Sequence, residues 1–203
     1  MIQEEINKYL LAPGITLYKS TKKEVNSILS LVEPAIGQMW KPSQGVNTKT
    51  YENEINQSRK CFDHPVSNNS FGLEKVLFNA VDNWIQPKID EYVKDYNVEN
   101  IIAGPYIFIK YQNNDKFDWH IDDGKKYPRT VSVSAYLNDD YTGGEIEFKH
   151  FNISYKPEAG DVIIFSSSYP YLHRVVPVIE GTRYAIVNWY RYDGYPAEMS
   201  KNV

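Results

Sequence analysis

Residues 129–138 read Arg-Thr-Val-Ser-Val-Ser-Ala-Tyr-Leu-Asn, and this stretch decides the fold class. Val131, Val133 and Ala135 alternate with polar residues, which is the period of two expected of a strand with one buried face. Working outward in both directions, the same period begins near residue 105 and continues through most of the second half of the chain. The pattern therefore predicts a β-rich C-terminal half.

Turn residues separate the strand candidates of this half from one another. The clearest turns are Asp139-Asp140, Gly143-Gly144 and the run from Pro157 to Asp161. Several short strands at close spacing indicate a jelly-roll or a barrel. The predicted strands are residues 106–111, 129–138, 145–149, 152–156, 161–166, 171–176 and 183–191.

The N-terminal half has apolar residues at helical spacing instead. Thr21 opens a capping-box pattern that starts a helix, and Pro34 is expected to end it. Residues 2–10 are a short amphipathic helix candidate. A longer helix is predicted from Phe71 onward, and Pro87 is expected to kink or split it.

Residues 34–69 are rich in Asn, Ser, Gly and Pro and show no clear period, so we expect an irregular stretch that covers or lines a site. The helices alone would expose too much apolar surface, and the sheet needs a cover. We therefore predict one α+β domain over residues 1–203. Supporting helices and a lid would occupy about 1–100, and a double-stranded β-helix (jelly-roll) core about 101–195.

Composition argues against several classes of protein. Hydrophobic residues make up 42% and charged residues 24% of the 203 residues, which is ordinary for a soluble globular protein. No apolar run approaches the ~18 residues that cross a bilayer. Because no basic segment is followed by an apolar one near Met1, we expect no secretory signal. Cys61 is the single cysteine, which fits a reducing, cytoplasmic setting. A net charge of −4 argues against a nucleic-acid partner.

The segment Trp119-His120-Ile121-Asp122 carries the first chemical signal. Residues two apart on a strand point to the same face, so an imidazole and a carboxylate would converge there. Together with one distant His, such a pair makes the facial triad of non-haem Fe(II) enzymes. The chain has 4 His and 26 acidic residues, so a His-x-acid match arises easily by chance and decides nothing alone.

A second signal follows further along the chain, where His173 precedes Arg183 by ten residues. A strand, a turn marked by Gly181 and a return strand would bring both side chains into one cavity. A keto acid that chelates iron needs its far carboxylate neutralised, and a guanidinium does this through a bidentate pair. The sequence thus predicts a third metal ligand and a cationic anchor on adjacent strands.

With these residues in place, residues 106–191 resemble the 2-oxoglutarate- and Fe(II)-dependent dioxygenases, and within them the prolyl 4-hydroxylase-like branch. The family's metal pattern falls on His120, Asp122 and His173. Its anchoring basic residue falls on Arg183, and all four are the implied catalytic residues. Related segments also match the family: Ser134-Ala135-Tyr136-Leu137-Asn138, Gly143-Gly144-Glu145 and Ala159-Gly160-Asp161.

The resemblance implies further roles. Tyr136 would hydrogen-bond the far carboxylate beside Arg183, and Tyr111 would lie near the co-substrate or the target. Arg129 and Trp189 occupy the positions that hold the target proline in prolyl hydroxylases. The implied activity is hydroxylation of a prolyl residue in a peptide or protein, with decarboxylation of 2-oxoglutarate to succinate. The implied cofactors are Fe(II), 2-oxoglutarate and O₂, with ascorbate as a supporting reductant.

Each residue also has a plainer interpretation. A one-residue slip would present Asp123 as the ligand in place of Asp122. Arg183 would otherwise be an exposed strand cation, Trp189 a core residue and Arg129 an edge-strand solubility residue. Three further residues have no partner at ligand spacing and are expected to be structural or exposed: Cys61, His64 and His150.

Two other functions stay open at this point. The same chemistry would serve a free amino acid or another small molecule, and a jelly-roll without turnover would be a binding module. Metal content and the effect of His173→Ala separate the binding module from an enzyme. A halogenase is disfavoured because those enzymes need a small residue where this chain has Asp122.

Overall fold

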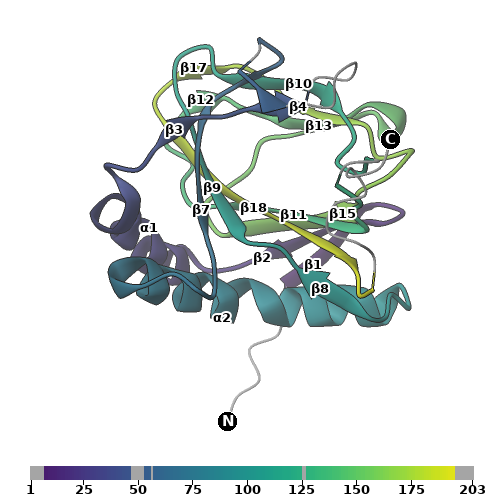
Figure 1. Cartoon of the computed structure of the whole chain (residues 1–203). Helices are drawn as coiled ribbons and strands as arrows, with labels where there is room; N and C mark the ends of the chain where they lie inside the picture. Colours follow the sequence, from purple (N-terminus) through teal and green to yellow (C-terminus); the bar gives the residue numbers. More distant parts are fainter. Residues whose placement is uncertain (1–6, 47–52, 56, 125–126, 195–203) are drawn as a thin grey trace.

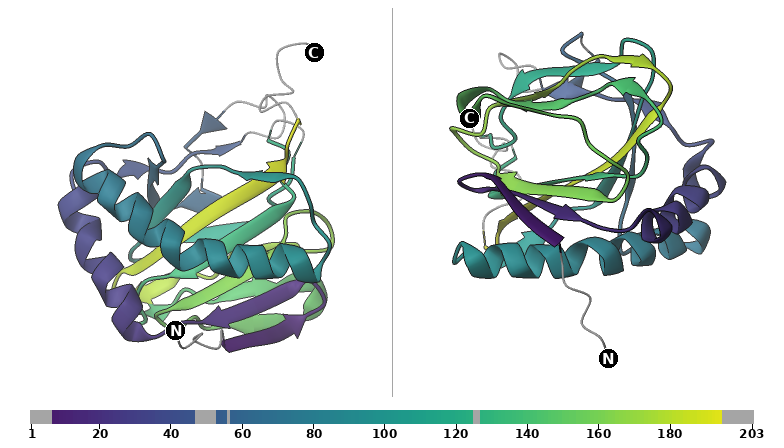
Figure 2. Two further views of the ribbon diagram at one scale, coloured as in Figure 1. Left: turned by 90° about the horizontal axis from the view of Figure 1, so that it is seen from below. Right: turned by 180° about the vertical axis from the view of Figure 1, so that it is seen from behind.

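The computed structural model describes residues 7–46, 53–55, 57–124 and 127–194. These residues form three layers (Figure 1): two helices, a large antiparallel sheet and a smaller antiparallel sheet that faces it. The helices are α1 (Lys22–Ile36) and α2 (Gly72–Asp95). Figure 2 shows them side by side across the outer face of the large sheet.

The large sheet carries most of the chain's strands and runs in the order β1-β2-β15-β11-β18-β9-β7-β3, with β8 pairing to β18. Apart from the β1–β2 hairpin, hydrogen-bonded neighbours on this path are not consecutive in the chain, which gives the crossed connections of a jelly-roll. In chain order its strands are β1 (Asn7–Ala12), β2 (Ile15–Lys19), β3 (Lys41–Pro42), β7 (Phe62–Val66), β8 (Ile101–Ala103), β9 (Tyr106–Tyr111), β11 (Val131–Tyr136), β15 (Asp161–Ser166) and β18 (Arg183–Tyr192).

The smaller sheet has the order β14-β13-β16-β10-β6. Two short pairs, β4 with β5 and β12 with β17, and the 3₁₀ turn η1 (Lys149–Phe151) complete the described structure. The remaining bounds are β4 (Gly45–Val46), β5 (Asn53–Glu54), β6 (Arg59–Lys60), β10 (Lys116–His120), β12 (Thr142–Gly143), β13 (Ile146–Phe148), β14 (Ile153–Tyr155), β16 (His173–Val175) and β17 (Val178–Glu180).

Strand β11 shows how the period of two divides the interior. Val131, Val133 and Ala135 are buried in the cluster that packs the large sheet against the helices, as predicted. On the alternate face, Tyr136 belongs to the cluster between the two sheets and Ser134 lines a pocket there. One face of the strand therefore supplies the core and the other face supplies a site.

The segment from Arg59 to Val66 joins the two sheets. Its first residues, β6, pair with β10 of the smaller sheet, and its last residues, β7, pair with β9 of the large sheet. Cys61 lies between the two strands and is buried. This crossing puts Arg59 on the wall of the space between the sheets.

The strands predicted in the C-terminal half are confirmed, and so is the capping box at Thr21. The helix predicted for residues 2–10 is wrong: residues 1–6 lie outside the described residues, and residues 7–12 form β1. A short isolated helix is marginal in water, whereas β1 gains backbone partners on the neighbouring strand β2. The left-handed Gly14, with φ +73, makes the connection between them possible.

One helix end, one predicted helix split and one loop also differ from expectation. Helix α1 continues to Ile36 although Pro34 lies in its last turn. Of the two outcomes expected at Pro87, the split is wrong, because α2 runs through this residue as one helix. Packing of both helices on the sheet outweighs the single hydrogen bond that each proline removes. Part of the stretch 34–69, expected to be irregular, forms β7 in the large sheet. Among the described residues, no helix is apolar over a span that would cross a membrane.

Candidate metal and co-substrate site

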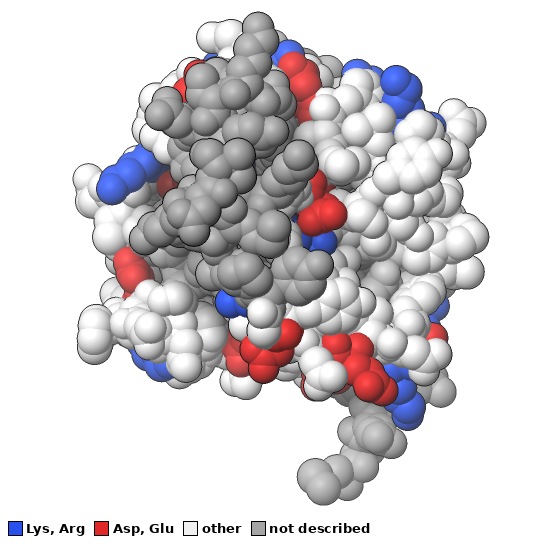
Figure 3. Space-filling model, turned by 45° about the vertical axis from the view of Figure 1, so that its right-hand side comes forward, with Lys and Arg blue, Asp and Glu red and all other residues white. Residues whose placement is uncertain are grey.

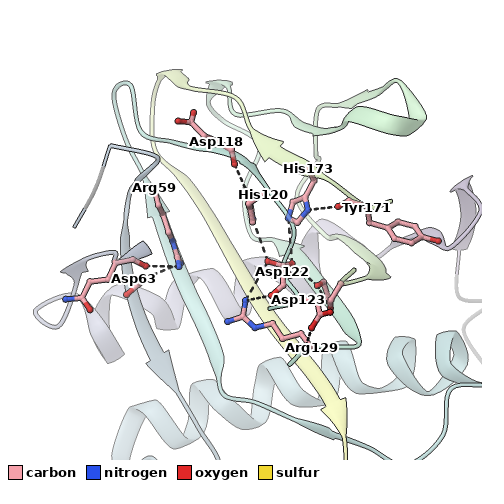
Figure 4. A network of polar contacts seen from close by, with 12 residues as sticks. Arg59, Asp63, Asp118, His120, Asp122, Asp123, Arg129, Tyr171 and His173 are labelled. Carbon is pink, nitrogen blue, oxygen red and sulfur yellow. Dashed lines mark hydrogen bonds and ion pairs between the residues drawn. The ribbon is translucent and has the colours of Figure 1, made fainter. Parts of the chain in front are cut away.

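Three predicted ligands meet at the edge of the smaller sheet (Figure 4). His120 ends β10 and His173 starts β16, and the two residues are paired in register. His120 Nε2 lies 3.6 Å from Asp122 Oδ1, and His173 Nε2 lies 3.7 Å from Asp122 Oδ2. All three ligand atoms lie within 4.8 Å of one another. Two imidazole nitrogens and one carboxylate on one side of a point are the donor set of a non-haem Fe(II) site.

Both imidazoles are held with the ligand nitrogen free. Nδ1 of His120 lies 2.8 Å from the Asp118 carbonyl oxygen, and Nδ1 of His173 lies 3.0 Å from that of Tyr171. A carbonyl only accepts, so each Nδ1 carries the proton and each Nε2 keeps its lone pair for a metal. Burial, with the neighbouring His120, lowers the pKa of His173 to about 4, so this ring is neutral at neutral pH.

The Asp122 carboxylate is buried and oriented by donors on both sides. Ser132 Oγ donates to its Oδ2 at 2.7 Å and lies 2.8 Å from Ser167 Oγ. Arg129 Nη1 lies 3.7 Å from Oδ1 and donates to the Asp122 carbonyl oxygen at 3.3 Å. Burial alone would raise the pKa of Asp122, but His173, His120 and Arg129 hold it well below its usual range. The carboxylate is therefore ionised and ready to bind a cation.

Arg183 lies in the interior at the start of β18, and its side chain is 2% exposed. Its guanidinium carbon is 4.8 Å from the Tyr111 ring centre and 5.0 Å from that of Tyr136. Gly144 makes room for it, because a Cβ there would come within 3.0 Å of Arg183 Cδ. The interpretation of Arg183 as an exposed strand cation is therefore wrong.

Three polar atoms around Arg183 show what this part of the site fits. Arg183 Nε, the Tyr136 hydroxyl and the Tyr141 hydroxyl are buried without a hydrogen-bond partner among the described residues. Buried donors are normally paired, and leaving one unpaired costs about 1–3 kcal/mol. A carboxylate would accept from all three, so the donor set fits the far end of 2-oxoglutarate.

A pocket with an empty volume of about 460 Å³, partly open to solvent, joins the triad to Arg183. Trp189 lines the pocket rather than the core behind the sheet, and Arg129 lies 3.6 Å from its ring centre. Arg129 is tied to Asp122 and Trp189, so it is more than an edge-strand solubility residue.

Asp123, His64 and Cys61 each have a partner outside the triad. Asp123 Oδ1 accepts from the Arg129 backbone N–H at 3.0 Å, and Asp122 supplies the triad oxygen, so the one-residue slip is wrong. His64 contacts Glu74 at 3.0 Å. The thiol of Cys61 is buried and lies 3.0 Å from Ser43 Oγ, which it donates to.

Several residues at the site were missed from the sequence. Ser132 shares a strand face with Tyr136, so the period of two offered a signal for it. Phe117 stacks on His120 with ring centres 3.5 Å apart, and Arg59 lies over Phe117 at 5.1 Å. Tyr141 lies in a turn, where no pattern marked it.

Known proteins resemble this chain in sequence and in fold. Residues 106–191 match the sequence profile of the 2OG-Fe(II) oxygenase superfamily. A prolyl 4-hydroxylase candidate of Acanthamoeba polyphaga mimivirus is 26% identical over 159 residues, which cover 65% of this chain and 64% of that protein. The match thus spans less than two thirds of the relative's length.

Two solved structures share the fold. The viral collagen prolyl hydroxylase of Paramecium Bursaria Chlorella virus-1, in its 2OG complex, has a TM-score of 0.64 at 18% identity, covering 88% of this chain and 96% of that one. A prolyl hydroxylase of Trichoplax adhaerens, in complex with a hypoxia inducible factor peptide fragment, has a TM-score of 0.63 at 19% identity, covering 87% and 83%. At these identities the likeness concerns the fold alone.

Proposed function

The chain belongs, through residues 106–191, to the 2OG-Fe(II) oxygenase superfamily, and we propose that it hydroxylates a prolyl residue in a peptide or protein. In the proposed reaction, 2-oxoglutarate is decarboxylated to succinate. One observation carries the proposal. The His-Asp-His triad and Arg183 line one pocket, and Arg183 Nε has no hydrogen-bond partner among the described residues. Trp189 lines the same pocket.

His120 Nε2, one Asp122 oxygen and His173 Nε2 would hold Fe(II). Bound Fe(II) supplies O₂ activation coupled to the conversion of 2-oxoglutarate into succinate and CO₂. The protein keeps both imidazoles neutral and Asp122 ionised. It holds each His ring through its Nδ1 hydrogen bond, so the ligands need no rearrangement on binding.

At the other end of the pocket, the Arg183 guanidinium would neutralise the far carboxylate of 2-oxoglutarate. Ile109, Val175 and Ala185 line the pocket as well. These apolar side chains exclude water from the space around the co-substrate, which strengthens the charge pair.

Proline as the target is supported by Arg129 and Trp189. The guanidinium carbon of Arg129 lies 3.6 Å from the Trp189 ring centre, so an apolar ring and hydrogen-bond donors are next to each other, which suits a pyrrolidine ring and its carbonyl. The two solved structures that share the fold are prolyl hydroxylases, one described as acting on collagen and one bound to a peptide fragment. We propose a proline-containing peptide or protein as the partner.

No nucleic-acid partner is proposed. On the described part of the face in Figure 3, Lys and Arg residues are scattered among acidic and uncharged ones and form no single basic area. The net charge of −4 agrees with this. The cytoplasmic location stays a prediction.

A free amino acid is the second candidate substrate. Arg59 lines the pocket as a further cation, and its Nη2 is 3.2 Å from Asp63 Oδ2, which fixes the guanidinium in place. A positioned guanidinium at the pocket wall would suit the carboxylate of a free amino acid.

Product analysis tests the proposed function. The enzyme would be incubated with Fe(II), 2-oxoglutarate and ascorbate in a desalted lysate and with a panel of proline-containing peptides, and Asp122→Ala would serve as the control. A gain of one oxygen on proline, seen by mass spectrometry and absent with Asp122→Ala, is the expected result. Succinate without a proline product would refute the prolyl target and move the search to free amino acids.

A further inference from the structure

Tyr141 is a buried tyrosine that packs with Ile109, Tyr111 and Val175 of the pocket wall, and none of the patterns above assigns it. It lies just before β12, its side chain is 5% exposed, and its hydroxyl has no hydrogen-bond partner among the described residues. Lys156 Nζ lies 3.4 Å from its ring centre and donates to its carbonyl oxygen at 3.0 Å. Gly181 packs on the other side, where a Cβ would come within 3.1 Å of Tyr141 Cα. The ring is therefore held in one place.

The ring of Tyr141 lies directly beside Arg183. A Cβ on Gly144 would come within 3.0 Å of both Arg183 Cδ and Tyr141 Cε2, so one small residue separates the two side chains. Burial raises the pKa of Tyr141, and the charge of Arg183 opposes that shift. The phenol is therefore neutral at neutral pH and has a proton to donate.

The Tyr141 hydroxyl is one of three unpaired buried polar groups gathered at this point, with Arg183 Nε and the Tyr136 hydroxyl. Among the described residues, Arg183 forms no ion pair with an acid, and its Nε has no hydrogen-bond partner. A carboxylate offers two oxygens with about four acceptor positions, enough for all three groups at once. A monocarboxylate bound only at the metal would leave all three unpaired.

We propose that Tyr141 binds the far carboxylate of 2-oxoglutarate together with Arg183 and Tyr136, and so selects a dicarboxylic 2-oxo acid over 2-oxo acids without the second carboxylate. The inference rests on the proposed function of the pocket. Lys156 and Gly181 fix the ring so that the hydroxyl is in place before the ligand arrives, which avoids an ordering cost on binding.

Tyr141→Phe tests this role, because it removes the hydroxyl and keeps the ring. Binding would be measured without O₂ on the Fe(II)-loaded protein, through the quenching of tryptophan fluorescence, to which Trp189 of the pocket contributes. We expect Kd for 2-oxoglutarate to rise roughly tenfold or more, as for loss of a hydrogen bond to a charged group. Kd for oxalate, which chelates iron but has no far carboxylate, should not change.

Tyr18→Phe is the matched control. The Tyr18 hydroxyl is also buried without a partner among the described residues, but the residue packs in the cluster under the helices. It should change neither affinity. Unchanged 2-oxoglutarate binding by Tyr141→Phe, or an equal loss for oxalate, would overturn the role of Tyr141 alone. A wild-type protein that binds no 2-oxoglutarate would overturn this role and the proposed function together.

Discussion

Ser132→Ala is the sharpest test of how the triad is organised. Ser132 is 1% exposed, and its hydroxyl donates to Asp122 Oδ2 at 2.7 Å while contacting Ser167 Oγ at 2.8 Å. With Oδ2 occupied by this donor, Oδ1 is the oxygen left for the metal. Alanine would leave a buried, ionised carboxylate free to rotate, and would leave the Ser167 hydroxyl without this partner.

The magnitude follows from comparing the metal-free and the metal-bound protein. The hydrogen bond is present without metal, so most of its roughly 1.5–3 kcal/mol, the range for bonds to charged groups, is lost from the stability of the metal-free protein. Metal affinity should fall by about tenfold, the lower end of the 10–100-fold range for outer-shell partners, since only the orientation of the carboxylate changes.

The assay is equilibrium dialysis of Fe(II) without O₂, combined with thermal unfolding of the metal-free protein. Ser134→Ala is the control, because Ser134 lines the same pocket from the same strand face and forms no hydrogen bond with Asp122. Unchanged iron affinity in Ser132→Ala, or an equal loss in Ser134→Ala, would refute the role given to the Ser132 hydroxyl.

Three further predictions follow from the same geometry. Arg183→Gln should weaken 2-oxoglutarate binding about a hundredfold or more, because it removes a buried charge partner. Calorimetry would measure this loss, and an unchanged affinity would contradict the role of Arg183 as the anchor of the far carboxylate. The pKa of His173, about 4 in the folded protein, is below its ordinary value of 6.5. As the pH falls, His173 therefore gains its proton in the unfolded state before it does so in the folded state. The contribution of His173 to the free energy of unfolding of the metal-free protein is complete above about pH 6.5 and is lost toward pH 4. A denaturation midpoint that does not change between pH 6.5 and pH 4, relative to His173→Ala, would exclude this pH dependence. Gly144→Ala should destabilise the protein by about 1–2 kcal/mol, because φ is +68 and the new Cβ would lie 3.0 Å from Arg183 Cδ. It should also raise Kd for 2-oxoglutarate, whereas Gly124→Ala, which meets nothing within 4 Å, should not.

The features that the sequence predicts well are local or repeat with a fixed period. The period of two identifies β11 and assigns Val131 and Val133 to the buried face, because alternation in a strand needs no knowledge of its partners. The spacing of His120 and Asp122 is also local. Strands such as β6 and β3, of two residues each, exist only because another strand lies beside them. No period can form over two residues, so the sequence shows no sign of them.

The residues around Arg183 show that the same limit applies to predicting the site from sequence. Arg183 is found from its spacing to His173 because both lie on regular strands. Tyr141 comes to lie beside Arg183 through a turn whose path depends on Gly144 and Gly181, with φ +68 and +83. Among 17 tyrosines, its role depends on neighbours that only the folded chain brings together.

The two ends of the pocket belong to different sheets, and this explains why the fold suits a two-ended co-substrate. His120 and His173 lie on paired strands of the smaller sheet, whereas Arg183 lies on β18 of the large sheet. A molecule that chelates a metal at one end and meets a guanidinium at the other spans the space between the sheets. The separation of the sheets is set by buried residues such as Phe148 and Phe165, whose rings meet edge to face with centres 5.0 Å apart. Both rings also contact His173, with ring centres 5.7 Å and 4.9 Å away. Packing behind the metal end thus helps to fix the length of the 2-oxo acid that fits, because a tightly packed interior does not stretch to suit a longer one.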